Sequence, residues 1–217
     1  MFPDDMKYIY KILFLLIISG MMNLPSYAQD NQQRIKFGLS YGIGTQQIFP
    51  YNSRDYIYNV SGYRIQVNRT IKIRGAFTFE LQFEPGIYIA KHRLLNEFFV
   101  QPKDGADYLE QREIFTREKT ITEYVLNTGF QVRYRISQAL SLFLLGGVGP
   151  MFSDTETERL ARGFAFSDVV AVGIAYRSGK FMFELRPGLR HVSNADLKYP
   201  NCGHNSSNID FAFSVFL

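Results

Sequence analysis

The feature that most constrains the fold is an alternation of apolar and polar residues that recurs along the chain. In residues 35–44 the odd positions are large and apolar, while the even positions carry lysine, glycine and serine. A period of two residues puts the two sets on opposite faces of a β-strand. The pattern recurs over residues 63–68, 77–89, 123–134, 140–149, 164–176, 181–193 and 209–217. The sequence therefore predicts an all-β fold with eight strands.

The connections between these segments alternate between short and long. Residues 72–75, 135–139 and 177–180 form the short ones, and residues 45–62, 90–119, 151–163 and 194–208 form the long ones. A soluble β-sandwich would show the same alternation within strands, but this rhythm of connections is typical of a barrel with short periplasmic turns and long outer loops. The mean hydropathy of −0.12 also suits a membrane surface built from alternating residues. We therefore expect an eight-stranded antiparallel transmembrane β-barrel.

The predicted inner face of the barrel carries both signs of charge. The interior of an eight-stranded barrel is about filled by side chains, and unpaired charges out of water are costly. Ion pairs and a closed lumen without a conducting pore are therefore expected. The charged inner positions are Glu80, Glu84, Arg133, Glu184, Arg186 and Arg190.

The N-terminus has the pattern of an export signal. Lys7 and Lys11 precede an apolar run at residues 12–18, and small residues stand at Ser26 and Ala28. This order predicts a cleavable signal peptide over residues 1–28, with one membrane-embedded barrel domain over residues 29–217. The net charge of +4 is scattered along the chain, which argues against a nucleic-acid partner.

The most informative motif lies near the C-terminus. It begins with His191, Ser193 and Asn194 and ends with the run Pro200-Asn201-Cys202-Gly203. This segment resembles the H-x-S-N-A…P-N-x-G signature of the lipid A 3-O-deacylase (acyloxyacyl hydrolase) family of outer-membrane barrels. The resemblance implies a His–Ser esterase site acting on lipid A of lipopolysaccharide, in the outer leaflet of a Gram-negative outer membrane. It implies no cofactor and no metal.

The strand period predicts where the two catalytic candidates point. His191 and Ser193 have the same parity as the apolar positions 181, 183, 185 and 189, so both are expected on the lipid-facing wall near the long loops. Two residues along one face are separated by roughly 6.5 Å. His191 would be the general base and Ser193 the nucleophile. The alternative is that both are merely polar residues at the rim of the barrel.

Three asparagines complete the candidate site. In the family a glutamate some fourteen positions after the histidine orients and charges the imidazole, and Asn205 occupies that position here. An amide oxygen can fix the imidazole tautomer but cannot stabilise imidazolium by charge, so Asp196 or Asp210 is a candidate acidic partner. Asn194 is expected to position the loop or to donate to an oxyanion, and Asn201 to hold the turn.

These observations lead to three functional hypotheses. The first is hydrolysis of the 3-O-linked hydroxyacyl ester of lipid A. The second is a non-catalytic barrel with a structural or surface-contact role, which the asparagine at position 205 favours. The third is a lipid esterase acting on phospholipids with the same residues. His92 and His204 fall in predicted outer loops without metal-ligand spacing, and solvated side chains are expected for both.

Overall fold

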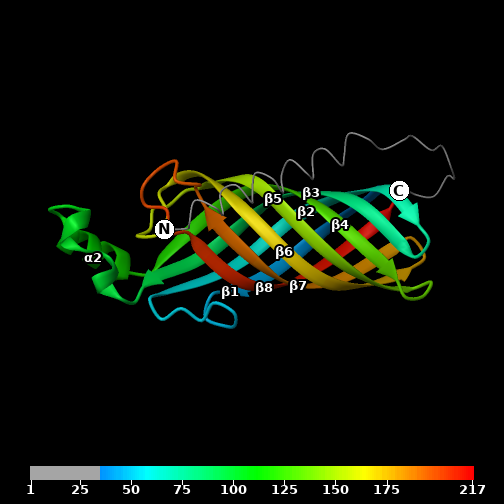
Figure 1. The fold of residues 1–217 in the computed structure, drawn as a ribbon, viewed down its shortest axis with the longest axis horizontal. Helices are drawn as coiled ribbons and strands as arrows, with labels where there is room; N and C mark the ends of the chain where they lie inside the picture. The colour runs from blue at the N-terminus through cyan, green and yellow to red at the C-terminus, as the bar shows by residue number, and fades with distance from the viewer. Residues whose placement is uncertain (1–34) are drawn as a thin grey trace. The chain divides into compact units, whose positions relative to one another are not determined.

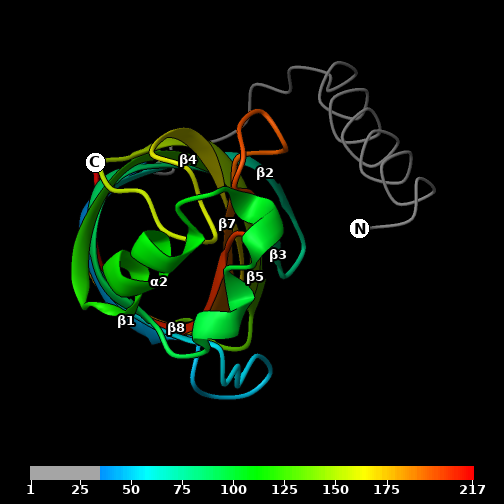
Figure 2. The ribbon, with the colours of Figure 1, turned by 90° about the vertical axis from the view of Figure 1, so that its left-hand side faces the viewer.

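A computed structural model describes residues 35–217, and its eight antiparallel strands close into a barrel (Figure 1). Each strand pairs with the next along the chain, and β1 pairs with β8 to complete the ring (Figure 2). The predicted fold class is confirmed, while the predicted signal peptide lies outside the described residues. The strands are β1 (Ile35–Thr45), β2 (Tyr56–Arg74), β3 (Phe77–Leu94), β4 (Lys119–Arg135), β5 (Leu140–Ser153), β6 (Gly163–Ser178), β7 (Phe181–Ser193) and β8 (His204–Phe216).

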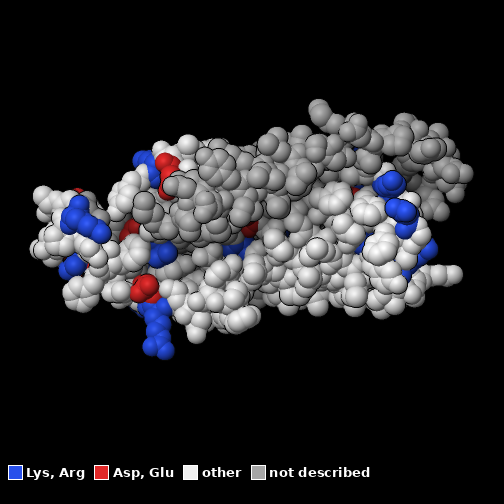
Figure 3. Space-filling model, in the orientation of Figure 1, with Lys and Arg blue, Asp and Glu red and all other residues white. Residues whose placement is uncertain are grey.

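The outer wall of the barrel is apolar, as the alternation predicts. On β1 the buried and exposed positions alternate from Ile35 to Ile43, and the exposed ones are the large apolar residues. With 11 to 19 residues, all eight strands are long enough for the 9–11 residues that cross a bilayer. On the face seen in Figure 3 the charged side chains gather toward the two ends of the barrel.

The helical segments of residues 35–217 lie in the long β3–β4 connection, at the end of the barrel that carries the long loops (Figure 1). They are two 3-10 turns, η1 (Glu97–Phe99) and η2 (Pro102–Asp104), and the helix α2 (Tyr108–Thr116). In the part of the chain that the structure describes, no helix has both the length and the apolar character needed to cross a membrane.

Ion pairs fill the lumen toward the short turns. Arg133 lies 2.5 Å from Glu184 and 3.3 Å from Glu80, and Lys36 lies 2.9 Å from Glu80. Farther along the lumen, Arg186 pairs with Glu84 at 2.9 Å. These side chains are buried, and opposite charges meet as expected from the inner face of the sequence.

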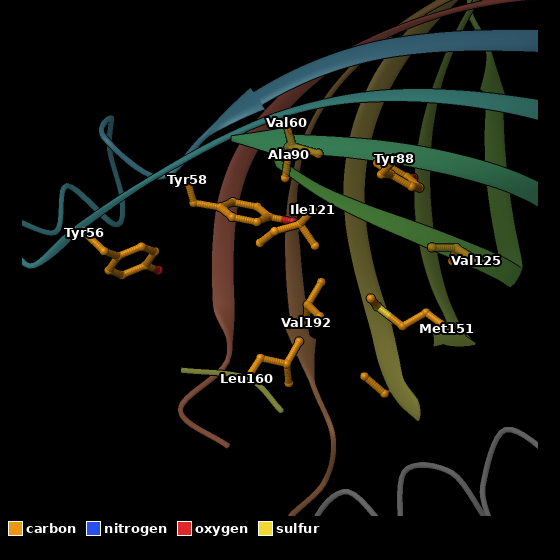
Figure 4. Close-up of a cluster of buried hydrophobic side chains, with 11 residues drawn as sticks. Tyr56, Tyr58, Val60, Tyr88, Ala90, Ile121, Val125, Met151, Leu160 and Val192 are labelled. Atoms are coloured by element: carbon orange, nitrogen blue, oxygen red, sulfur yellow. The ribbon is translucent and has the colours of Figure 1, made fainter. Parts of the chain in front are cut away.

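The lumen toward the long loops is filled differently, by a cluster of buried apolar side chains that we call the outer core (Figure 4). Its residues come from six strands and from the β5–β6 loop. They are Tyr56, Tyr58, Val60, Tyr88, Ala90, Ile121, Val125, Met151, Leu160, Ala165 and Val192. The strands extend beyond their predicted outer ends to build it, most of all β2, which begins at Tyr56 instead of near residue 63.

The prediction of solvated loop histidines at positions 92 and 204 was wrong. His92 lies in β3 and His204 opens β8, and both side chains are 1% exposed. His204 stacks on Tyr58 with ring centroids 4.7 Å apart, and His92 is 2.9 Å from a carboxylate oxygen of Glu158. The extended strands carry both imidazoles into the lumen, which the predicted loop boundaries had excluded.

Candidate active site

His191 and Ser193 lie at the outer end of β7, and both are half-buried on the outward face of the barrel. Val192, between them, is 1% exposed and points into the outer core beside Leu160 (Figure 4). Since neighbouring side chains on a strand point to opposite faces, burial of Val192 holds its two neighbours outward. The strand continues to Ser193 without a shift in its register against β6.

Gly203 shows how close the two side chains come to each other. A methyl group added at Gly203 would lie 3.1 Å from Cε1 of His191 and 3.5 Å from Cβ of Ser193. These two atoms are therefore separated by no more than the sum of those distances. The imidazole and the serine side chain thus border the same small space beside the glycine.

Asn205 lies directly across from His191 in the β7–β8 pairing. Its Oδ1 is 2.7 Å from Nδ1 of His191. An amide oxygen can only accept a hydrogen bond, so this contact places the proton of neutral His191 on Nδ1. Nε2 is then left with a lone pair, as a general base requires.

Asn194 and Asn201 hold the loop that follows β7. The side-chain amide of Asn194 donates to the carbonyl oxygens of Lys198 at 2.6 Å and Pro200 at 3.4 Å. Asn201 accepts from the backbone N–H of Asn194 at 2.7 Å and donates to Asp196 at 2.9 Å. Of the two roles expected for Asn194, this geometry supports positioning of the loop, because its donor group is engaged by carbonyls.

A second loop supports the first from inside the barrel. The backbone N–H groups of Cys202 and Gly203 both donate to the carbonyl of Arg159, at 2.7 and 2.9 Å. The Arg159 side chain in turn donates to the Gly203 carbonyl at 2.9 Å, and its guanidinium lies over the Tyr56 ring. The next residue, Leu160, is anchored in the outer core. The site therefore rests on the β5–β6 loop, which sequence patterns do not connect with it.

Neither acidic partner considered from the sequence meets the imidazole. Asp210 faces the lumen and pairs with Arg64 at 3.0 Å, whereas His191 faces outward. Asp196 accepts its hydrogen bond from Asn201 in the loop. Sequence reasoning overlooked Asp168, which lies on β6 directly across from His191.

A sequence signal for Asp168 exists. From Phe164 to Ile174 the outward positions of β6 are apolar except for this carboxylate, and the tight β6–β7 turn fixes the pairing of the two strands. Counting back from that turn along both strands puts Asp168 opposite His191.

The described residues hold no cluster of three or more histidine, cysteine, aspartate or glutamate side chains arranged to bind a metal ion. Cys202 is an exposed free thiol. The groups available for chemistry on the outward face include the imidazole, the serine hydroxyl and the polar side chains beside them.

The chain was also compared with models of known protein families. The model of the family described as "Lipid A 3-O-deacylase (PagL)" matches residues 104–214, more than half of the chain, including all of the residues around His191. No curated protein sequence matches the chain.

Two solved structures were aligned with this chain. The outer membrane enzyme PagL aligns with a TM-score of 0.53 and 15% sequence identity, over 81% of this chain and 97% of that one. Neisserial surface protein A aligns with a TM-score of 0.45 and 8% identity, over 84% of this chain and 97% of its own. At 15% identity, the likeness to PagL concerns the fold.

Proposed function

Because the chain belongs to the lipid A 3-O-deacylase (PagL) family, we propose that it is an outer-membrane serine esterase that removes the 3-O-linked hydroxyacyl chain of lipid A. The observation that carries the proposal is the 2.7 Å contact between Nδ1 of His191 and Oδ1 of Asn205, beside Ser193 on the outward wall. A base with a fixed tautomer next to a serine hydroxyl is the arrangement that activates a serine nucleophile.

In the first half of the reaction, Nε2 of His191 takes the proton of Ser193 as Oγ attacks the ester carbonyl. The tetrahedral intermediate then collapses. The bond to the sugar oxygen breaks, and the imidazolium returns its proton to that oxygen. The products are a sugar hydroxyl and an acyl group esterified to Ser193.

In the second half, His191 takes a proton from water as the water oxygen attacks the acyl-enzyme. The hydroxy fatty acid leaves, and the proton returns to Ser193. The outward position of the site supports this substrate, because lipid A resides in the outer leaflet and its ester could approach from the bilayer without entering the lumen.

Mass spectrometry of lipid A provides the test. Cells that make 3-O-acylated lipid A would express the wild type, Ser193→Ala or Ser61→Ala. Ser61 is a matched control, since it is a half-buried, outward-facing serine on β2. We expect loss of one hydroxyacyl chain with the wild type and Ser61→Ala, and intact lipid A with Ser193→Ala.

Two rivals predict other results. Intact lipid A in all three strains, with folded barrels in the membrane, would favour a non-catalytic surface protein, the role that Asn205 in place of the family's glutamate suggests. Release of phospholipid acyl chains, dependent on Ser193 and without change in lipid A, would favour a phospholipid esterase. Gel mobility before and after boiling establishes in each strain that the barrel is folded.

A further inference from the structure

Asp168 is a carboxylate on an outward face that is otherwise apolar. It lies on β6 between Phe166 and Val170, its neighbours on that face, and its side chain is exposed. A charged side chain on the lipid-facing wall of a barrel is destabilising to a degree that depends on its depth in the membrane. An ionisable residue there is by default a functional hypothesis.

The strand register brings this carboxylate to the active site. Asp168 pairs with His191 across β6 and β7, and His191 pairs with Asn205 across β7 and β8. Side chains directly opposite on antiparallel strands have Cβ atoms about 4.5–5.5 Å apart. The imidazole is therefore flanked by an amide on one side and by a carboxylate on the other, and it interacts electrostatically with the carboxylate.

Two further titratable groups, Arg190 and His204, are buried behind the imidazole, in the lumen. Arg190 pairs there with Glu123 at 2.8 Å, so a carboxylate already offsets its charge. His204 is 3.1 Å from the hydroxyl of Thr157 and lies among aromatic rings. Asp168 is the carboxylate on the same face of the barrel as the imidazole.

We propose that Asp168 is a positioning residue that stabilises the imidazolium form of His191, while Asn205 fixes the tautomer of the same ring. The proposal rests on the function proposed above. When Ser193 Oγ bonds to the acyl carbon, its proton moves to Nε2, and the ring gains a positive charge between Asn205 and Asp168. That charge disappears when the proton passes to the leaving sugar oxygen. The two tasks that one glutamate performs in the family would thus be divided between two strands.

A fluorophosphonate probe tests the proposal without using lipid A. Ser193 Oγ bonds to phosphorus, fluoride leaves and the serine proton passes to His191, so the labelling rate reports on the imidazolium directly. For the purified full-length barrel we expect Asp168→Asn to label about tenfold more slowly, the effect of removing one neighbouring opposite charge. Glu118→Gln, which removes an exposed carboxylate of the β3–β4 loop, should label like the wild type.

A double variant shows whether Asp168 acts through its charge or only through its place in the structure. Asn205→Glu supplies a carboxylate from the opposite side, so the double variant Asp168→Asn/Asn205→Glu should recover most of the lost rate if charge is what Asp168 provides. A purely structural role for Asp168 predicts no recovery. Equal labelling of the wild type and Asp168→Asn, or a slow double variant with a folded barrel, would overturn the proposal.

The same experiment distinguishes this proposal from the proposed function. A wild type that labels and depends on Asp168 but leaves lipid A intact would support the role of Asp168 and refute only the substrate. A folded wild type that does not label would refute both.

Discussion

At the scale of single residues, Gly203 is the position where the loop leaves no room for a side chain beside His191 and Ser193. Its φ of +70° lies in the left-handed region, and an added methyl group would approach the Val192 carbonyl oxygen to 2.4 Å and Cε1 of His191 to 3.1 Å. A glycine here lets the backbone pass directly beneath the imidazole. The final residue of the motif is thus explained by contact with the site.

Gly203→Ala should therefore displace the imidazole. A shift of about 1 Å in a catalytic group can reduce the rate by about 100-fold. The change in rate would be measured by fluorophosphonate labelling. Gly75→Ala is the control, because Gly75 has a φ of +59° and nothing within 4 Å of an added methyl group. Both variants meet the same backbone cost of about 1–2 kcal/mol, so equal labelling rates would argue against a special role for Gly203.

The placement of site residues was predictable from sequence only where the alternation of side chains along one strand determines it. Strand parity placed His191 and Ser193 on the outward face, and their burial agrees. The contact between His191 and Asn205 spans the long β7–β8 loop, so counting along a hairpin cannot derive it, and it was expected only from the resemblance to the family. The support from Arg159 depends on two loops that meet in three dimensions.

At the scale of elements, the β5–β6 loop supports the candidate site through its hydrogen bonds to Cys202 and Gly203. Leu160 is 1% exposed in the outer core, one residue from the carbonyl that holds Cys202 and Gly203. Leu160→Ala should lower the free energy of unfolding by about 2–5 kcal/mol, the usual cost of a buried leucine. The vacated space should also loosen the loop and slow labelling of Ser193.

A second buried leucine, which lies away from the site, separates the loss of stability from the slower labelling of Ser193. Leu145 is 4% exposed in a second buried cluster, with Phe143 and Met182, toward the short turns. Leu145→Ala should lower the free energy of unfolding by a similar amount while labelling at the wild-type rate per folded molecule. Urea titration and labelling of the same samples provide both measurements. Equal labelling rates for the two variants would contradict the role assigned to the β5–β6 loop.

The elements were predictable where the two faces of a strand differ. The bounds of β1 and β7 agree with the alternation to within a residue. The first seven residues of β2 were missed because the pattern is inverted there: the inner face carries Tyr56, Tyr58 and Val60, and the outer face carries Asn59 and Ser61. The start of β8 was missed for another reason, since both of its faces are polar between His204 and Ser207.

At the scale of the whole molecule, the barrel has two interiors with different tasks. The outer core lies directly behind the candidate site, where Val192 contributes to it from β7, and the buried pairs of Arg190 with Glu123 and His92 with Glu158 lie beside it. The interior toward the short turns is ionic, with Glu184 buried between Arg133 at 2.5 Å and Lys36 at 4.0 Å. Glu184 precedes His191 by seven residues, roughly 23 Å along the strand. Stability and catalysis should therefore respond separately to changes in the two interiors.

Glu184→Gln tests this separation. Neutralising one member of a buried ion network leaves uncompensated cations, which costs about 3–5 kcal/mol of the free energy of unfolding. Labelling of Ser193 per folded molecule should remain at the wild-type rate, because the outer core and both supporting loops are untouched. Glu118→Gln disrupts an exposed pair with Lys91 and should cost less than about 1 kcal/mol. If Glu184→Gln slowed labelling in barrels that still migrate as folded, the ionic interior would have to contribute to the site, and the division between the two interiors would be wrong.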